Sequence, residues 1–88
     1  MTDEECIALG YSEPRLMPNG CRCALAKMMF TTALIVGITP LGYGFRYCYE
    51  HYHDASDALK AWDGTGDPPG LWIKKKGLGE DKLGPGAA

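Results

Sequence analysis

The clearest pattern of hydrophobic and polar positions lies in residues 43–50, where aromatic residues occupy every second position. Successive side chains of a β-strand point to opposite faces of a sheet, so this alternation predicts a strand with one aromatic face. The aromatic face would carry Tyr43, Phe45, Tyr47 and Tyr49, and the other face Gly44, Arg46, Cys48 and Glu50. We expect the aromatic face to be buried, because aromatic side chains contribute strongly to a small core.

A second predicted strand precedes it in residues 33–38, which are apolar at every position. A continuous apolar run of this length is typical of a strand covered on both faces. The intervening residues 39–42 have the composition of a turn, since Pro40 fixes one backbone angle and Gly42 permits a positive φ. Residues 32–38 and 43–49 are therefore predicted to form an antiparallel hairpin.

Helical spacing replaces the alternation in residues 54–62. The apolar residues recur at the interval of one helix face, at Ala55, Ala58, Leu59 and Trp62. They predict an amphipathic helix packed across one face of the sheet. Asp54 is expected to cap this helix, and Gly64 to follow its end.

The N-terminal residues predict a second, shorter helix from about Asp3 to Leu9. Thr2 and Glu5 have the spacing of a capping box, in which each side chain accepts a backbone N–H of the other residue. Because helix nucleation is costly, a helix this short needs tertiary contacts to be stable. We expect Ile7 and Leu9 to provide them.

Residues 23–29 permit two interpretations. Their composition favours a helix from Cys23 to Met29, but the β-rich residues that follow favour a strand. We predict strands on both sides of a bend near Phe30–Thr32, and the helix remains the alternative. The sequence PNG at residues 18–20 predicts a tight turn, and residues 71–73 are expected to add a short strand.

Together these elements predict an α+β domain over residues 1–76. It would consist of a small antiparallel sheet of three to four strands, one main helix packed on a face and a short N-terminal helix. From Gly77 onward little is expected to pack, so residues 77–88 are predicted to form a flexible C-terminal tail.

Length and composition fit one small globular domain. The chain has 88 residues, of which 45% are hydrophobic and 23% charged. Its most apolar stretch, from Cys23 to Ile38, is shorter than the ~20 apolar residues that span a bilayer. The acidic N-terminus does not resemble a secretory signal, so we expect a cytoplasmic protein with its four cysteines reduced.

The sequence LGYGFRYCY at residues 41–49 is close to the octapeptide with which RNA-recognition domains stack bases. However, Leu41 and Arg46 stand where that motif has a basic and an aliphatic residue. Residues 50–73 also contain five acidic residues and one lysine, a balance that repels phosphates. We therefore predict a core strand and no direct nucleic-acid binding.

Metal and catalytic sites are weakly indicated. Enough zinc-ligand types are present in Cys21, Cys23, Cys48, His51 and His53, but the spacing of Cys21 and Cys23 is shorter than in usual structural sites. Nucleophilic catalysis needs a nucleophile beside a base that a third group holds, and the only nearby pair in the sequence, Cys48 and His51, need not be in contact. We predict no enzyme, no catalytic residue, no cofactor and no bound metal, although zinc binding stays open.

Charged residues form two separate groups along the chain. Lysines predominate after residue 73, where four lysines accompany two acidic residues. The other group is acidic and precedes the lysines. We predict that it binds a partner, because charge complementarity orients docking. Its members are Glu50, Asp54, Asp57, Asp63 and Asp67.

The pattern of RYCY, AWDG, DPPG and WIKKKG between Phe30 and Gly86 resembles small uncharacterised proteins of phages and prophages. Some small phage proteins of this kind are anti-CRISPR inhibitors. The resemblance implies a non-enzymatic protein that binds a host CRISPR effector complex and occludes its nucleic-acid or partner site. It assigns no site residue here. The alternatives are a phage accessory or assembly protein, and a zinc- or nucleic-acid-binding module.

Overall fold

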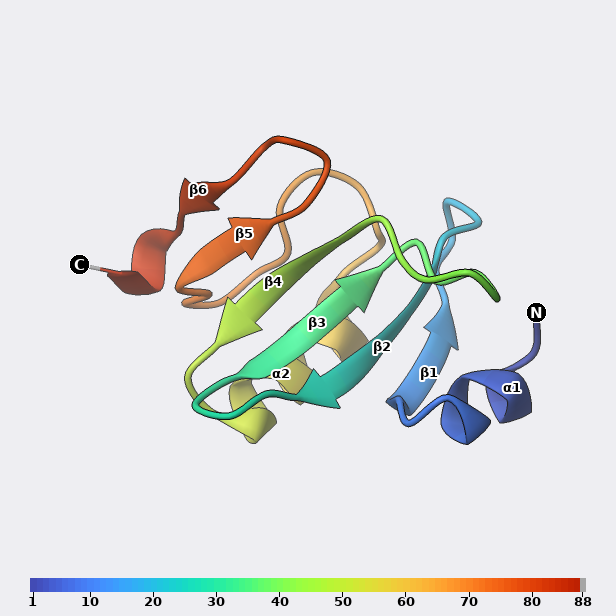
Figure 1. Ribbon diagram of the computed structural model, residues 1–88. Helices are drawn as coiled ribbons and strands as arrows, with labels where there is room; N and C mark the ends of the chain where they lie inside the picture. The colour runs from blue at the N-terminus through green and yellow to red at the C-terminus, as the bar shows by residue number, and fades with distance from the viewer. Residues whose placement is uncertain (88) are drawn as a thin grey trace.

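The computed structural model describes residues 1–87 as an α+β fold built on one antiparallel sheet of six strands, which lie in chain order from β1 to β6 (Figure 1). The main helix covers one face of the sheet, and the two termini lie at opposite ends of the molecule. The elements are α1 (Asp3–Ala8), β1 (Ser12–Leu16), β2 (Arg22–Lys27), β3 (Thr32–Val36), β4 (Phe45–Tyr49), α2 (Tyr52–Ala61), β5 (Lys74–Lys76), β6 (Lys82–Leu83) and the 3-10 helix η1 (Pro85–Ala87).

The predicted hairpin of residues 32–38 and 43–49 is confirmed as the pair β3 and β4. Thr32 lies opposite Tyr49, and Val36 lies opposite Phe45. Every residue of β3 is buried, as the continuous apolar run predicts. Residues 22–27 form β2 and pair with β3, so the strand interpretation of this segment is confirmed over the helix alternative.

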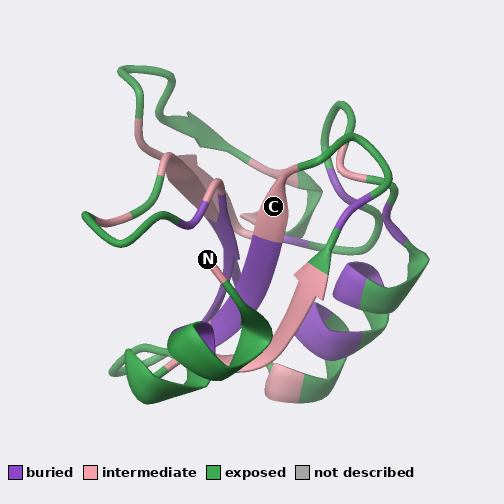
Figure 2. Ribbon diagram, turned by 90° about the vertical axis from the view of Figure 1, so that its right-hand side faces the viewer, coloured by how far each residue is buried: buried purple, intermediate pink, exposed green. Residues whose placement is uncertain are grey.

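The main core lies between the sheet and α2. Tyr47 occupies its centre, and its ring packs edge-to-face on Trp62 and Trp72 at centroid distances of 5.9 and 5.0 Å. Figure 2 shows the buried residues on the side of α2 that faces the sheet. The predicted helix face is confirmed, since Ala55, Ala58, Leu59 and Trp62 are all buried.

A smaller core lies on the opposite face of the sheet, beneath α1. It contains Cys6 with Ala24, Ala33, Ile35 and Ile38. The capping box of α1 is confirmed. The prediction that Ile7 and Leu9 dock this helix was wrong, because both side chains are more than half exposed and Cys6 is the residue that packs.

The predicted strand count of three to four was too low, and β1 is one of the strands missed. Glu13 has a φ of 51° and Pro14 lacks a backbone donor, so this segment has a bulge between Ser12 and Arg15 and no regular alternation. Such a strand has no period-2 signal in the sequence. A bulge and a proline also protect the free edge of a sheet from further pairing.

The C-terminal segment also differs from the prediction. The short strand β5 is Lys74–Lys76 rather than residues 71–73, and it pairs with both β4 and β6. The prediction that little packs beyond Gly77 was wrong, because the Gly84 and Gly86 amides donate to Ile73 and Trp72. Residue 88, the last of the predicted tail, lies outside the described residues.

The ends of α2 were predicted inaccurately. Its N-cap is His51, whose side chain makes no capping hydrogen bond, and Asp54 lies in the first turn instead. The helix ends at Ala61 with Trp62 as its C-cap, and Gly64 lies two residues beyond the cap. Arg15 compensates at this end, because its guanidinium donates to the carbonyls of Leu59 and Lys60 at 3.1 and 2.7 Å. Across residues 1–87, neither helix has the length and apolar character that a membrane crossing requires.

Candidate functional site

The five acidic residues predicted to bind a partner have different environments in the structure. Glu50 is exposed in the turn between β4 and α2, and Asp54 and Asp57 lie on α2. Asp63 and Asp67 lie in the loop that follows the helix. Asp54 and Asp57 line one groove, whereas the carboxylates of Asp63 and Asp67 are hydrogen-bonded within the molecule, so the predicted set does not form one continuous site.

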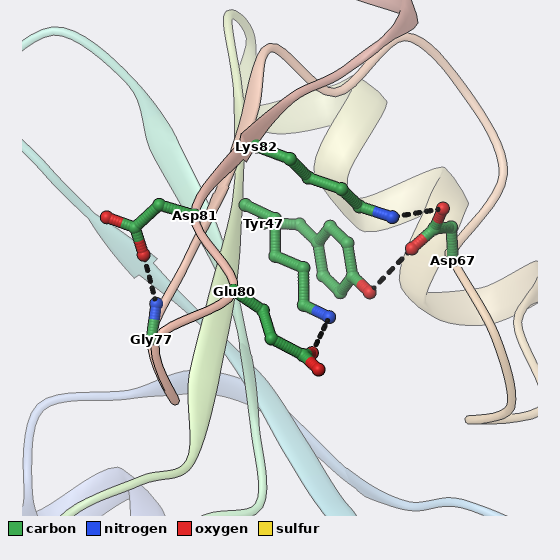
Figure 3. Close-up of polar contacts among 7 residues, drawn as sticks. Tyr47, Asp67, Gly77, Glu80, Asp81 and Lys82 are labelled. Atoms are coloured by element: carbon green, nitrogen blue, oxygen red, sulfur yellow. Dashed lines mark hydrogen bonds and ion pairs between the residues drawn. The ribbon is translucent and has the colours of Figure 1, made fainter.

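Asp67 is engaged inside the molecule. Its carboxylate accepts hydrogen bonds from the Tyr47 hydroxyl at 3.0 Å and from Lys82 Nζ at 3.1 Å (Figure 3). Burial alone would raise the pKa of Asp67, but the hydrogen bonds from Lys82 and Tyr47 outweigh it and lower the pKa. The carboxylate therefore holds the loop and β6 onto the core and is poorly placed to meet a partner.

Asp63 shapes the loop after α2. Its carboxylate accepts hydrogen bonds from the backbone N–H and the hydroxyl of Thr65, at 2.9 and 2.8 Å. These two bonds, the backbone one first, lower the pKa of Asp63. Thr65 in turn accepts the indole N–H of Trp62 at 2.9 Å. The main role of Asp63 is thus to fix the loop beside a core tryptophan.

Asp54 and Asp57 are the two predicted residues whose carboxylates remain exposed beside a concave surface. Their side chains are 47% and 74% exposed. Within residues 1–87 neither forms an ion pair with lysine or arginine, and only His53 approaches them, at 3.5 and 3.9 Å. They line a groove of about 360 Å³ together with Ala58, Ala61, Pro69, Gly70 and Leu71.

The far wall of this groove is the segment Pro69–Leu71, which sequence reasoning did not assign to any site. Tyr49, in the core, holds this segment in place, because its hydroxyl donates a hydrogen bond to the Pro69 carbonyl at 2.7 Å. Gly70 turns the chain with a φ of 91°, and the side chain of Leu71 is left exposed. The sequence signals were the small residues Ala58 and Ala61 on α2 and the DPPG turn.

The lysines of the C-terminal strands do not form a uniform basic face. Lys75 Nζ lies 4.7 Å from the centre of the Phe45 ring and pairs with Glu80 at 3.1 Å. Lys82 lies over the Trp72 ring and pairs with Asp67. Both cations are thus partly neutralised by carboxylates and held against aromatic rings.

The cysteines and histidines singled out for zinc are not brought together. In the register of the sheet, Cys23 lies opposite Val36 and faces the main core, whereas Cys48 lies opposite Ala33 on the other face. Residues 1–87 contain no group of three or more His, Cys, Asp or Glu side chains able to hold a metal ion. Burial raises the pKa of the Cys23 thiol to about 11, so this thiol is a poor nucleophile at neutral pH.

The aromatic strand is part of the core rather than a stacking platform. Tyr47 and Tyr49 are buried, and burial raises the pKa of both hydroxyls. Phe45 is half-buried beneath Lys75. Tyr43 precedes β4, and its hydroxyl accepts a hydrogen bond from Arg46 at 2.7 Å. Three of the four rings are therefore not free to stack bases.

Comparison of the chain with protein-family models, curated proteins and solved structures found no match. The groove beside α2 and the charged residues around it are therefore the features from which a function is inferred.

Proposed function

We propose that the protein is a phage-encoded, non-enzymatic inhibitor that binds a host CRISPR effector complex in stoichiometric amounts. It acts in the cytoplasm of the bacterial host and occludes nucleic-acid or partner binding. The observation that supports this proposal is the exposed carboxylate pair of Asp54 and Asp57, which has no lysine or arginine partner within residues 1–87. The class of target comes from the resemblance to small phage proteins.

Charge complementarity provides the physical reason for this target. A surface that grips nucleic acid carries lysine and arginine side chains, and these are strong partners for carboxylates. Exposed carboxylates speed and orient docking on such a surface. Asp54 and Asp57 are one helical turn apart, so both carboxylates can engage the same basic patch.

The experiment is a phage plaque assay in CRISPR-bearing hosts that express the protein. Wild-type protein should restore plaque formation on at least one host, because it blocks interference. The double variant Asp54→Lys/Asp57→Lys should lose most of this effect, since it would present like charges to the target. Co-purification of tagged wild-type protein with the effector complex should be lost in parallel.

Two controls separate binding from folding. Glu4→Lys reverses an exposed charge on α1, which does not line the groove, and should leave inhibition unchanged. Circular dichroism should show that the double variant remains folded. If the double variant inhibits like wild type, the assigned surface is wrong. If wild-type protein affects no CRISPR system tested, the protein is an accessory or assembly factor instead.

A further inference from the structure

The groove beside α2 combines two chemically different walls. Asp54 and Asp57 form a charged rim on the helix side, and Pro69 and Leu71 form an apolar wall on the loop side. The small side chains of Ala58 and Ala61 lie between them and leave the space open. A ligand that fills the groove must therefore present a cationic group and an apolar group close together.

We infer that this groove binds a short segment of a protein partner in which an arginine or lysine is flanked by an aliphatic residue. The inference rests on the proposed function, because it names the chemistry of the partner at that same surface. The cationic head group would lie between the two carboxylates. The aliphatic neighbour and the stem of the basic side chain would pack on Leu71 and Pro69.

Within residues 1–87 no lysine or arginine pairs with the two carboxylates of the groove. The carboxylates of Asp54 and Asp57 both lie within 4 Å of the His53 imidazole, at 3.5 and 3.9 Å. A guanidinium group presents five N–H donors in a planar fork, so it can satisfy two neighbouring carboxylates at once. An arginine would therefore gain more from this rim than a lysine.

The apolar wall adds a separate requirement. Leu71 is 69% exposed. The backbone beside it is nevertheless held in place, because the neighbouring Trp72 carbonyl accepts the Gly86 N–H at 3.0 Å. The Tyr49 hydroxyl holds Pro69 from the core side. A rigid, exposed apolar wall loses little conformational freedom when a ligand packs on it, so it favours binding. A hydrophilic basic peptide would leave this wall uncovered.

The test is an NMR titration of ¹⁵N-labelled protein with acetylated and amidated tripeptides. Leu-Arg-Leu should produce saturable amide shifts confined to residues 54–61, Gly70 and Leu71. Leu-citrulline-Leu has the same shape without the charge, and it should bind at least about threefold more weakly, the effect of one exposed ion pair. Ala-Arg-Ala should also bind more weakly, because it leaves Leu71 uncovered.

Protein variants provide the matched comparison. Asp57→Asn should weaken Leu-Arg-Leu binding but leave Leu-citrulline-Leu binding unchanged, whereas Leu71→Ala should weaken both. Glu4→Gln, on α1, should alter neither. Equal binding of the arginine and citrulline peptides, shifts centred elsewhere, or no saturable shift in the millimolar range would overturn the inference.

The two proposals fail in distinguishable ways. Arginine-selective peptide binding without any effect on interference would leave the groove's specificity intact and remove the CRISPR target. Inhibition could instead depend on Asp54 and Asp57 while the groove fails to distinguish arginine from citrulline peptides. That result would support the inhibitory surface and contradict the ligand chemistry inferred for the groove.

Discussion

At the scale of single residues, Trp62 joins α2 to the loop that follows it. The side chain is only 4% exposed, packs on Tyr47 and donates its indole N–H to the Thr65 carbonyl. Trp62→Ala should lower the free energy of unfolding by about 3–5 kcal/mol, the usual loss for a large buried aromatic. Urea unfolding measures this value. Trp62→Phe keeps an aromatic ring and should cost less; an unchanged stability in Trp62→Ala would contradict the buried position.

At position 84 the fold leaves no room for a side chain. A β-carbon at this position would lie 2.2 Å from the Trp72 carbonyl oxygen and 2.3 Å from its indole ring. Gly84→Ala should therefore destabilise the protein by about 1–3 kcal/mol, as overpacking does, and lower its melting temperature. The neighbouring Leu83→Ala removes an exposed side chain and should have little effect. Equal melting temperatures for all three proteins would show that residues 84–87 do not rest on Trp72.

At the scale of elements, β1 clamps the main helix through polar side chains. The Glu13 carboxylate accepts hydrogen bonds from Tyr52 at 2.6 Å and Ser56 at 2.7 Å, both on α2. The Arg15 guanidinium donates hydrogen bonds to carbonyls at the C-terminal end of the same helix. The strained backbone at Glu13 thus brings two side chains of one edge strand onto both halves of α2.

This clamp should make the stability of the protein dependent on acid. The hydrogen bond from Tyr52, followed by that from Ser56, lowers the pKa of Glu13 below its ordinary value of 4.5. The contribution of Glu13 is therefore complete above pH 4.5 and is lost as the pH falls through its lower folded pKa. In urea unfolding between pH 7 and 3, the stability gap between wild type and Glu13→Gln should narrow below about pH 4.5.

A double-mutant cycle distinguishes this clamp from a general charge effect. Tyr52→Phe/Ser56→Ala removes the two donors. The pH-dependent stability that Glu13 contributes should then be mostly lost. Adding Glu13→Gln to that variant should then change little, because the interaction is already lost. A full additional loss on adding Glu13→Gln would show that the carboxylate acts through other groups.

Elements with a regular period could be predicted from the sequence, and the others could not. The alternation in residues 43–49 and the helical spacing at Ala55, Ala58, Leu59 and Trp62 both report a buried face, so β4 and the packing side of α2 were predicted correctly. In contrast, β1 contains a bulge and a proline, and β6 has only two residues. Pairing with a neighbouring strand defines both, and neither leaves a local signal.

At the scale of the whole molecule, the candidate site could be predicted only in part. Asp54 and Asp57 were predicted to be contact residues from their charge and spacing, which are local properties, and the structure places both beside one groove. Asp67 was grouped with them, but it contacts Tyr47 and Lys82, which lie 20 and 15 positions away in the chain. The groove itself arises where Pro69–Leu71 folds back beside α2, a contact that no sequence period specifies.

The isolated protein should bind neither RNA nor single-stranded DNA specifically at physiological salt. Tyr47 and Tyr49 are buried in the core, and Lys75 covers Phe45, so few rings of the aromatic strand are free to stack. Fluorescence anisotropy with labelled oligonucleotides measures this directly. Micromolar, salt-sensitive binding that disappears in Tyr43→Ala and Phe45→Ala would contradict the prediction.

The chain-order arrangement of the sheet has a kinetic consequence. Strands β1 to β4 form three successive hairpins, so their contacts close short loops, whereas β5 joins β4 only after residues 50–73 have crossed the core. We expect the hairpins around β3 to be formed in the folding transition state and β5 and β6 to dock later. In stopped-flow measurements, Leu34→Ala should therefore slow refolding, whereas Trp72→Ala should mainly accelerate unfolding.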